Sequence, residues 1–534
     1  MASDGGSTSA LAPFARRAFR WLWLGVVISS VGMWAQTVGA QWLFVDDANA
    51  ATIVALVQTA SQLPVVLLAL PAGVLADAFD RRWLLFGVQV YVIVVASTLA
   101  VLTSLGRVTP GLMLAFTFAL GVGLALQVPT WQPLIAELVP RSHLAAAVRL
   151  DMVSVNVARA AGPAIAGVII AAWSVPPVFA FNAACAAVLA VILVAWRRPA
   201  SATADRERFL PALRAGGRYV RHEPVVRLIL LRLTLFVAPA TALWALLPLV
   251  ASQQLGLHAG GYGLLFAALG AGAVAAALGL GRITAHVSSN ALLCLVGLLY
   301  AAAFALSMLA PGLLAAIPLL MVAGFGWTAT VSTVNAELQL FLPGWVRARA
   351  IAVYLMAFMG TMAVASPIWG LLTQRAGLAT AVYAASALVA LGALTGLALR
   401  IPESSSADRA ALAFWNDPSL GIVPEPDAGP VQVIVEYHVP AEHEADWLIA
   451  MQAMRRSRMR SGAYRWELYR IGERPDRFLE VFAIPSWEEH ERQHQHRLTA
   501  EDQAIEDAAF AFTASPPRAE HLLPPLPNSE TLPG

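Results

Sequence analysis

The sequence predicts an all-α membrane protein with twelve transmembrane helices in two six-helix halves, followed by a small C-terminal α+β domain of ferredoxin-like order. Three observations lead to this fold class. Of the 534 residues 58% are hydrophobic, and the mean hydropathy of +0.66 is far above that of soluble proteins. The first 427 residues carry only 40 charged side chains, whereas the last 107 carry 28. The first part contains twelve long apolar stretches, and the second part alternates in the manner of strands and helices.

Each apolar stretch is close to or above the roughly 20 residues that a helix needs to cross about 30 Å of hydrocarbon. The first is too long for the core of a cleaved signal peptide and is followed at once by further stretches. We therefore expect twelve spans, at residues 18–43, 51–75, 83–105, 111–136, 146–172, 177–196, 228–250, 261–283, 290–309, 312–334, 347–372 and 378–399.

The distribution of arginine predicts the orientation, because cytoplasmic loops are enriched in positive charge. With the N-terminus inside, nearly all loop arginines fall on the inner side, and only Arg107 and Arg375 fall outside. Both termini are therefore expected in the cytoplasm. The connection 197–227 carries eight arginines and is expected to lie as an amphipathic linker on anionic lipid.

An internal repeat divides the membrane part into halves. Pro140 and Gly167, around the fifth span, recur as Pro343 and Gly370, around the eleventh, both at an offset of 203 residues. Two halves related by pseudo-symmetry are typical of alternating access to a site at the membrane midplane. The expected organisation is a first half at 1–200, a basic linker at 201–227, a second half at 228–401, a linker at 402–430 and the α+β domain at 431–523.

Composition excludes several kinds of chemistry. The chain contains no lysine, so it has no phosphate-binding P-loop lysine and no Schiff-base lysine. Cys185 and Cys294 lie far apart in apolar runs, which argues against a disulfide and against a thiolate metal site. We expect a protein that is not an enzyme, with no cofactor, no bound metal and no nucleic-acid partner, whose partners are the lipid bilayer and a small-molecule substrate.

Several motifs resemble those of a known family. The segment 73–82 (GVLADAFDRR) resembles the loop signature of the major facilitator superfamily (MFS), with Asp80 where many members have Gly. The segments 19–23 (FRWLW) and 62–64 (QLP), together with the fifth-span motif Asn156-x-x-Arg159-x-x-Gly162-Pro163, are similar to the bacterial drug and siderophore exporters of the transmembrane secretion effector family. The resemblance implies an MFS fold, export of small molecules by proton antiport, and location in a bacterial plasma membrane.

The loop signature is expected to act as a gate. Gly73 allows close helix approach, Asp77 can cap the eleventh span, and Arg81 and Arg82 can pair with acids across the inner surface. Such contacts would close the inner side in one state and break in the other. The alternative for the two arginines is that they only determine topology.

The fifth span contains the least expected residue of the membrane part. Arg159 lies near mid-span, where a cation facing lipid is costly, so we expect it to face a cavity or a partner and to take part in substrate binding or coupling. Asn156 lies one turn earlier and can hydrogen-bond toward it. Gly162 and Pro163 are expected to kink the helix, with Gly167 one turn further on. The alternative is an arginine held by backbone carbonyls.

Few acids are available to carry a proton. Glu137 and Asp151 flank the loop between the fourth and fifth spans, and Glu337 ends the tenth span. We name them as candidates for substrate binding or coupling, although an interfacial or gating role is the alternative. Gln36 in the first span is a candidate for cavity polarity, and most of the 16 tryptophans are expected in the interfacial belts.

The C-terminal region has the β-α-β-β-α order of a ferredoxin-like domain. Strands are expected at 431–439, 464–471, 478–484 and 518–523, with helices at 441–461 and 486–510. Its outline is similar to small dimeric monooxygenase barrels, which implies a homodimer through this domain. His490 and His494 share a helix face, but no third ligand is evident, so a solvated face is expected rather than a metal site.

Three classes of function remain. A secondary exporter explains the twelve spans, the repeat and the loop signature. The alternatives are a transporter-like receptor and a membrane-tethered enzyme whose C-terminal domain carries the activity.

Overall fold

The computed structural model describes residues 11–196, 209–402, 412–415 and 420–525. These residues fall into two compact units. The bundle unit comprises the described residues within 1–203, 231–334 and 355–400, and the tail unit those within 204–230, 335–354 and 401–534. The expected linkers 201–227 and 402–430 lie partly outside the described residues, at 201–208, 403–411 and 416–419, and the expected domain boundaries stay predictions.

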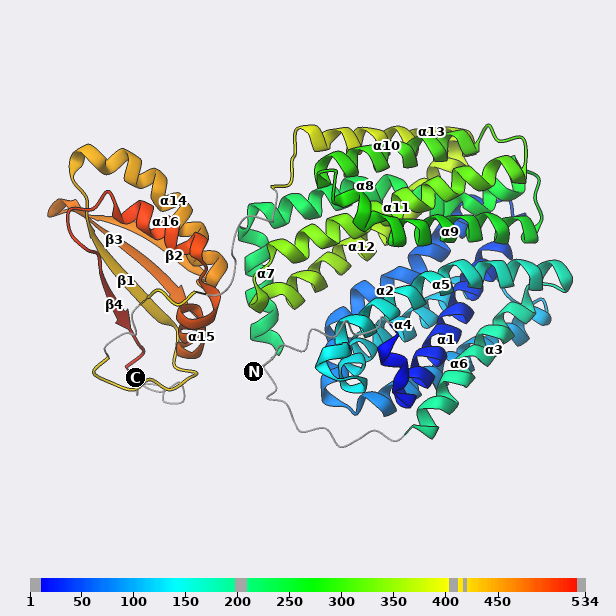
Figure 1. The fold of residues 1–534 in the computed structure, drawn as a ribbon, viewed down its shortest axis with the longest axis horizontal. Coiled ribbons are helices and arrows are strands. Elements are labelled where there is room, and N and C mark those ends of the chain that lie inside the picture. The colour runs from blue at the N-terminus through cyan, green and yellow to red at the C-terminus, as the bar shows by residue number, and fades with distance from the viewer. Residues whose placement is uncertain (1–10, 197–208, 403–411, 416–419, 526–534) are drawn as a thin grey trace. The chain divides into compact units, whose positions relative to one another are not determined.

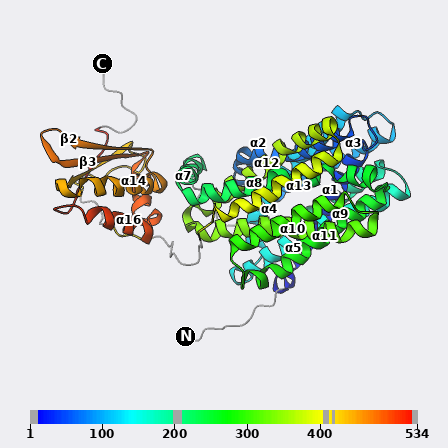
Figure 2. The same cartoon turned by 90° about the horizontal axis from the view of Figure 1, so that it is seen from above.

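Apolar helices build the bundle unit, where they pack side by side (Figures 1 and 2). The amino-terminal half consists of α1 (Arg17–Trp42), α2 (Ala50–Ala78), α3 (Arg81–Ser104), α4 (Pro110–Leu138), α5 (Leu144–Ala172) and α6 (Pro176–Ala195). The carboxyl-terminal half consists of α8 (Pro224–Leu249), α9 (Ala259–Thr284), α10 (Ser289–Ser307), α11 (Leu313–Phe341), α12 (Gly344–Ala376) and α13 (Leu378–Leu394).

Within the described residues, these twelve helices are long and apolar enough to cross a membrane. Each coincides with one expected span to within a few residues at most ends, so the predicted fold class is confirmed. The linker between the halves forms a further helix, α7 (Phe209–His222), as expected for its amphipathic sequence. α8, α11 and α12 continue across the boundary between the two units.

Local sequence signals explain where several helices begin. The Asp80 carboxylate accepts hydrogen bonds from the backbone N–H groups of Arg82 (2.9 Å) and Trp83 (3.2 Å), which makes it the N-cap of α3. Asp80 therefore has a local structural role at the start of α3. A single residue, Gly377, separates α12 from α13, and its φ of +88° is accessible to glycine without strain.

The C-terminal domain is a four-stranded antiparallel sheet with strand order β2-β3-β1-β4. Its elements are β1 (Val431–His438), α14 (Glu444–Ser461), β2 (Arg465–Ile471), β3 (Arg474–Ile484), α15 (Trp487–Arg492), a π-helical turn (Gln493–Arg497), α16 (Ala500–Phe510) and β4 (Arg518–Leu522). This is the ferredoxin-like order, so the predicted α+β domain is confirmed. α14 and α16 cover one face of the sheet (Figures 1 and 2).

The core of this domain follows from the period of two along β1. Val431, Val433, Val435 and Tyr437 alternate with polar residues and are all buried. They pack in one cluster with Trp447 and other apolar side chains of α14. Burial of each such side chain contributes roughly 1.5–3 kcal/mol, which is what holds the helices against the sheet.

Candidate functional site

Arg159 lies in the centre of the bundle unit, between aromatic rings of both halves. Its guanidinium carbon is 5.5 Å from the ring centroid of Trp34 on α1 and 6.0 Å from that of Trp244 on α8. An arginine over the face of tryptophan is stabilised by the ring quadrupole, by up to about 2 kcal/mol when water is excluded. The residue expected from sequence to face a cavity or a partner therefore lies where the two halves meet.

The rings around Arg159 continue into an aromatic cluster of the carboxyl-terminal half. The Trp244 centroid lies 5.5 Å from that of Phe266 on α9 and 5.2 Å from that of Trp327 on α11. Trp34 also contacts Phe266, at 6.0 Å, so the cluster links α1 to α9 as well. The walls of the site are thus apolar and polarizable, with one cation among them.

The charge of Arg159 has no anionic partner among the residues that the structure describes. Its side chain is half-buried, and its buried Nε makes no hydrogen bond within that part of the chain. The alternative was an arginine held by backbone carbonyls, and no such carbonyl accepts a hydrogen bond from Nε in the described residues. An uncompensated buried cation is unfavourable unless something else supplies the negative charge.

The fifth-span motif positions this arginine between two helices by means of its glycines. A β-carbon at Gly162 would lie 2.6 Å from Trp34 Cβ, so only glycine allows α5 to approach α1 there. A β-carbon at Gly167 would lie 3.0 Å from both the Ala259 carbonyl oxygen and Gly263 Cα of α9. α5 runs as one helix through Pro163, and the expected kink stays a prediction.

The repeat in the sequence corresponds to a second contact of the same kind. Gly370 of α12 faces α2, where a β-carbon would lie 2.5 Å from Ala55 Cβ and 2.7 Å from the Ala51 carbonyl oxygen. Gly167 and Gly370, which are 203 residues apart, thus each bring a helix of one half against a helix of the other. These two contacts agree with the pseudo-symmetry inferred from sequence, which stays a prediction.

Polar contacts between the halves lie at the end of the bundle where α1 finishes, here called the Gln41 end. The Tyr262 hydroxyl donates to Gln41 Oε1 (2.6 Å), and Gln41 Nε2 donates to the Trp244 carbonyl (3.4 Å). Gln374 Nε2 on α12 donates to the Ala48 carbonyl (3.0 Å). Together with the glycine contacts, these bonds hold the halves together at the Gln41 end.

At the opposite end, here called the Arg81 end, the signature arginines make contacts within the amino-terminal half. Arg81 pairs with Glu137 of α4 at 2.6 Å. Arg82 donates through Nε to the Leu193 carbonyl (2.7 Å) and through a terminal nitrogen to the Val194 carbonyl (2.8 Å), at the carboxyl end of α6. Arg82 thus caps a helix, and the gating role of both arginines stays a prediction.

The other candidates from sequence are distributed along the bundle. Asp151 accepts a hydrogen bond from the Trp131 indole (2.8 Å). The Asn156 side chain donates to the Met152 carbonyl one turn earlier (2.9 Å), so the expected hydrogen bond toward Arg159 is wrong for this structure. Gln36 is buried and accepts from Asn182 Nδ2 (3.3 Å), within the amino-terminal half.

Three candidates stay untested by the described contacts. Gly73 and Asp77 lie in the last turns of α2, and the Asp77 side chain is outside the described part of the structure. Glu337 is half-buried near the end of α11 and belongs to the tail unit. Their roles in gating and coupling remain predictions.

The aromatic wall was not identified from sequence. We expected most tryptophans in the interfacial belts, but Trp34, Trp244 and Trp327 lie in the bundle centre, and the last two are almost completely buried. The signal was available, since each of these residues stands near the middle of its span and not at its end. Depth along the span therefore distinguishes these tryptophans from belt residues.

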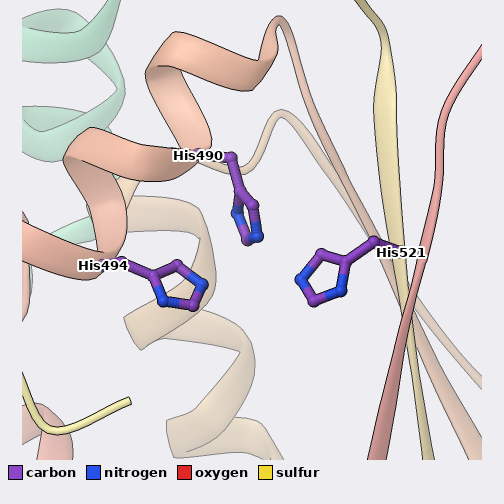
Figure 3. Close-up of side chains that lie close together, drawn as sticks. All are labelled: His490, His494 and His521. Carbon is purple, nitrogen blue, oxygen red and sulfur yellow. The ribbon is translucent and has the colours of Figure 1, made fainter. Parts of the chain in front are cut away.

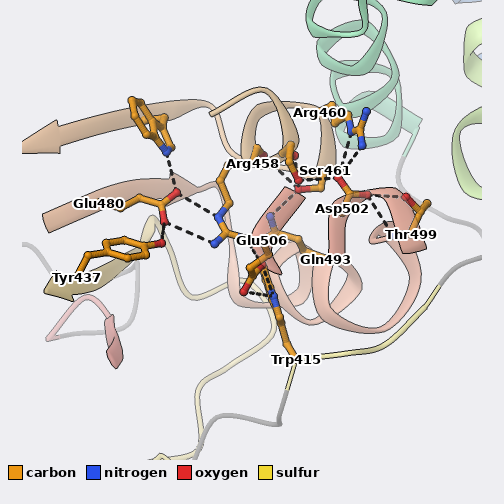
Figure 4. A network of polar contacts seen from close by, with 12 residues as sticks. Trp415, Tyr437, Arg458, Arg460, Ser461, Glu480, Gln493, Thr499, Asp502 and Glu506 are labelled. Carbon is orange, nitrogen blue, oxygen red and sulfur yellow. Dashed lines mark hydrogen bonds and ion pairs between the residues drawn. The ribbon is translucent and has the colours of Figure 1, made fainter. Parts of the chain in front are cut away.

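The C-terminal domain contains a buried arginine, Arg458, in a polar network (Figure 4). Its Nε donates to Glu480 (3.1 Å) and a terminal nitrogen donates to Glu506 (3.1 Å). Glu480 also accepts from the Tyr437 hydroxyl (2.7 Å), and Glu506 accepts from the Trp415 indole (2.9 Å). Burial alone lowers the pKa of Arg458, but the two carboxylates outweigh it and raise the pKa above its ordinary value.

Arg460 connects α14 with other segments of the same tail unit. It pairs with Asp502 of α16 (2.8 Å) and with Glu223, just before α8 (2.7 Å). Nearby, the Arg497 guanidinium lies 5.0 Å from the ring centroid of Trp345, in the first turn of α12. Within the tail unit, these contacts join the C-terminal domain to the segments around Glu223 and Trp345.

Three histidines converge in the same domain (Figure 3). His490 and His494 are buried, so the expected solvated face is wrong, and β4 supplies His521 as the third imidazole that sequence reasoning did not find. One potential ligand nitrogen from each ring lies within 4.8 Å of the others. Burial, reinforced by His494 and His521, lowers the pKa of His490 to about 3, so this imidazole is neutral at physiological pH.

The twelve-helix bundle of two halves around a central cation defines an MFS-type membrane transporter. Sequence comparison agrees and is more specific. The chain belongs to the transmembrane secretion effector family, whose sequence profile matches residues 8–527. The resemblance inferred from the motifs is thereby confirmed.

Two curated relatives match part of the chain. The staphyloferrin A transporter of Staphylococcus aureus is 28% identical over 156 residues, which cover 29% of this chain and 39% of the relative. An uncharacterized MFS-type transporter of Bacillus subtilis is 26% identical over 205 residues, covering 37% of this chain and 48% of the relative. The chain thus spans less than half the length of these relatives.

Solved structures confirm the fold. A bacterial homologue of the human lysosomal transporter Spinster, in an inward-facing and unoccupied conformation, matches with a TM-score of 0.60 at 14% identity, covering 74% of this chain and 98% of that one. The nucleoside transporter NupG, as a D323A mutant, matches with a TM-score of 0.58 at 13% identity, covering 71% and 100%.

Proposed function

We propose that the protein is a secondary active exporter of negatively charged small molecules, of which siderophores are the leading class, in a bacterial plasma membrane. Alternating access would move the substrate past a central site built on Arg159. Both termini and the Arg81 end would face the cytoplasm. A proton gradient would drive the transport.

The unpaired charge of Arg159 carries this proposal. The Arg159 guanidinium lies between Trp34 and Trp244 and contacts no carboxylate among the described residues. It can therefore bind a carboxylate or a similar anion of the substrate. The surrounding rings offer apolar contact to the rest of such a molecule. Because the rings come from both halves, a bound anion would sense their relative movement.

The conformation supports a cycle of alternating access. The halves are joined at the Gln41 end by the glycine contacts and by the Gln41 and Gln374 hydrogen bonds. With the orientation that the arginine distribution predicts, this end is extracellular. The structure then corresponds to a state closed toward the outside, which is the state that an exporter uses to load substrate from the cytoplasm.

The direction and the energy source have separate support. The family description names secretion, and one relative transports a siderophore. The absence of lysine removes the P-loop route to ATP hydrolysis. An ion gradient is therefore the favoured source of energy, and a bacterial plasma membrane maintains one of protons.

Transport into inside-out vesicles tests the proposal, because export then appears as uptake. The probe is a carboxylate siderophore, with its neutral methyl ester as the matched control. We expect uptake of the acid but little uptake of the ester, and loss of uptake when a protonophore is added. The Arg159→Ala variant should transport neither compound above the background of empty vesicles.

Other outcomes would correct specific parts of the proposal. Equal uptake of acid and ester would contradict the anion site. Uptake that requires ATP would contradict a secondary transporter, and uptake that responds to Na⁺ instead of the protonophore would change only the ion. Accumulation in right-side-out vesicles alone would reverse the direction.

A further inference from the structure

The histidine cluster of the C-terminal domain has the composition of a metal site. His490 and His494 lie one turn apart at the junction of α15 with the π-helical turn, and His521 lies on β4, opposite Val433 of β1. Figure 3 shows the three rings directed toward one another. In the sequence, α16 separates the segment that contains His490 and His494 from the strand that contains His521. The fold nevertheless brings the three imidazoles together.

We propose that His490, His494 and His521 bind one divalent transition-metal ion, with Zn²⁺ as the reference ion. The proposal concerns only the C-terminal domain and does not depend on the exporter function. It would give the domain a metal-dependent element that neither the family description nor the relatives assign to it.

A chain of hydrogen bonds directs the lone pair of His490 toward the cluster. The Ser461 hydroxyl donates to the Ser457 carbonyl (2.8 Å), so its oxygen accepts from Gln493 Nε2 (2.8 Å). This fixes the Gln493 amide, whose Oε1 then faces His490 Nδ1 at 3.4 Å. Because an amide oxygen can only accept, Nδ1 carries the proton and Nε2 carries the free lone pair.

His490 Nε2 is a buried nitrogen atom without a hydrogen-bond partner among the described residues. The side chain is 1% exposed, and Nε2 makes no hydrogen bond within the described part of the chain. A buried nitrogen lone pair without a partner is uncommon, because its desolvation costs roughly 1–3 kcal/mol. A metal ion bound by the three rings would satisfy it.

The surroundings resemble those of other histidine-ligated metals. Trp487 and Trp415 pack against the cluster, with ring centroids 5.3 Å from His490 and 4.7 Å from His494 respectively. Trp415 in turn donates to Glu506 of the Arg458 network, in which two carboxylates face one guanidinium. The cluster therefore has an apolar wall that limits the access of water, as is typical around bound metals.

The local backbone is also unusual at this point. The π-helical turn Gln493–Arg497 contains His494 directly after the α-helical turn that contains His490. Such turns are rare in proteins and occur frequently at functional sites. Here the turn carries one of the three imidazoles.

The ligand set selects the kind of ion. Three neutral imidazoles suit Zn²⁺ and its neighbours Cu²⁺, Ni²⁺ and Co²⁺, and they suit Mg²⁺ and Ca²⁺ poorly. Tetrahedral Zn–N bonds of about 2.0–2.1 Å place the nitrogens about 3.4 Å apart. Because the ligand atoms lie within 4.8 Å, small rotations of the side chains close the site, and a fourth position remains for water or another group.

Zinc binding by the full-length protein tests the proposal. The protein is purified in detergent without a polyhistidine tag, stripped of metal, and titrated with ZnCl₂ against a chromophoric chelator. We expect about one equivalent bound with a Kd below about 1 µM. Titration with Co²⁺ should produce the visible absorption of a tetrahedral site.

Substitutions locate the ion. His490→Ala, His494→Ala and His521→Ala should each weaken zinc binding by at least about 100-fold, and Gln493→Ala by about 10-fold to 100-fold, since it acts only by orienting His490. His496→Ala is the matched control, because His496 lies on the same turn but is exposed, and it should leave the affinity unchanged. His521, which is half-buried on an edge strand, tests the site with the least risk to folding.

Two results would overturn the proposal. The first is that the unmodified protein binds no Zn²⁺ at about 10 µM and gives no tetrahedral Co²⁺ spectrum. The second is that His521→Ala, with an unchanged circular dichroism spectrum, binds Zn²⁺ as tightly as the His496→Ala control. Neither result would bear on transport by Arg159, so failure here is distinct from failure of the exporter.

Discussion

Arg159 and Arg458 both lie among aromatic rings, and the other contacts of their guanidinium groups differ in a way that separates a binding site from a structural core. Arg458 in the C-terminal domain is bonded to Glu480 and Glu506 and lies between rings. Arg159 in the bundle also lies between rings, but among the described residues it has no carboxylate. Carboxylates of the protein neutralise the charge of Arg458, whereas the charge of Arg159 is available to an anionic ligand.

The difference follows from what each region must do. A small soluble domain gains conformational specificity when a buried charge is fully paired, and its pairing need not change. A transport site must exchange its partner in every cycle, so a permanent carboxylate beside Arg159 would compete with the substrate. Rings stabilise the cation weakly enough to leave it available.

The largest expected effect is the loss of transport on removal of the Arg159 charge. Arg159→Ala should lower vesicle uptake of an anionic substrate by more than about 100-fold, because the site loses its charge-assisted hydrogen bonds. Arg159→Lys should recover only part of the rate, since lysine lacks the planar fork. Arg107→Ala, on the exposed α3–α4 connection, is the control and should transport normally. Normal transport by Arg159→Ala would show that Arg159, like Arg458, has no direct role in transport.

The reverse pattern is expected for the paired arginine. Glu480→Gln leaves Arg458 and Tyr437 without their shared carboxylate, and loss of a buried partner costs about 3–5 kcal/mol. Hydrogen–deuterium exchange of α14 and β1 peptides in the full chain should show a loss of protection of this size. Substrate affinity of the bundle should change less than twofold. Unchanged protection would mean that the network contributes little to the domain.

A smaller effect is expected where the halves close on each other. Gly167→Val and Gly370→Val place side chains where a β-carbon already meets backbone or side-chain atoms at 2.5–3.0 Å. Both should slow transport about 10-fold and make a cysteine introduced near Gln41 more accessible to a membrane-impermeant maleimide. Gly312→Val, whose β-carbon meets nothing within 4 Å, is the control. Equal labelling of all three variants would argue against closure at this end.

The smallest effect concerns a surface pair that resembles the buried one only in its residue types. Arg465 and Glu467 on β2 are joined at 2.8 Å, and Arg465 is well exposed to water while Glu467 is partly exposed. Because solvent screens such pairs, Glu467→Gln should leave the exchange protection of β2 unchanged within error. A loss comparable to that of Glu480→Gln would show that burial is not what distinguishes the two pairs.

Much of the architecture could be predicted from the sequence because it depends on periodic burial. The twelve spans follow from the length of apolar segments that must satisfy their backbone in lipid, and the alternation from Val431 to Tyr437 gives a strand with one buried face. The offset of 203 residues between Gly167 and Gly370 predicted two halves, and both glycines lie at contacts between them. Arg159 was found because a charge at mid-span is rare.

The tertiary structure decided which side chains meet, and sequence periodicity carries no such information. Nothing in the sequence relates His521 to His490 and His494 until β4 pairs with β1 and brings the edge strand beside α15. Likewise, Trp34 and Trp244 become walls of one site only because α1 and α8 pack around α5. Contacts between residues far apart in the chain depend on the packing angle and register of whole elements, which are set by many small interactions and by no single local signal.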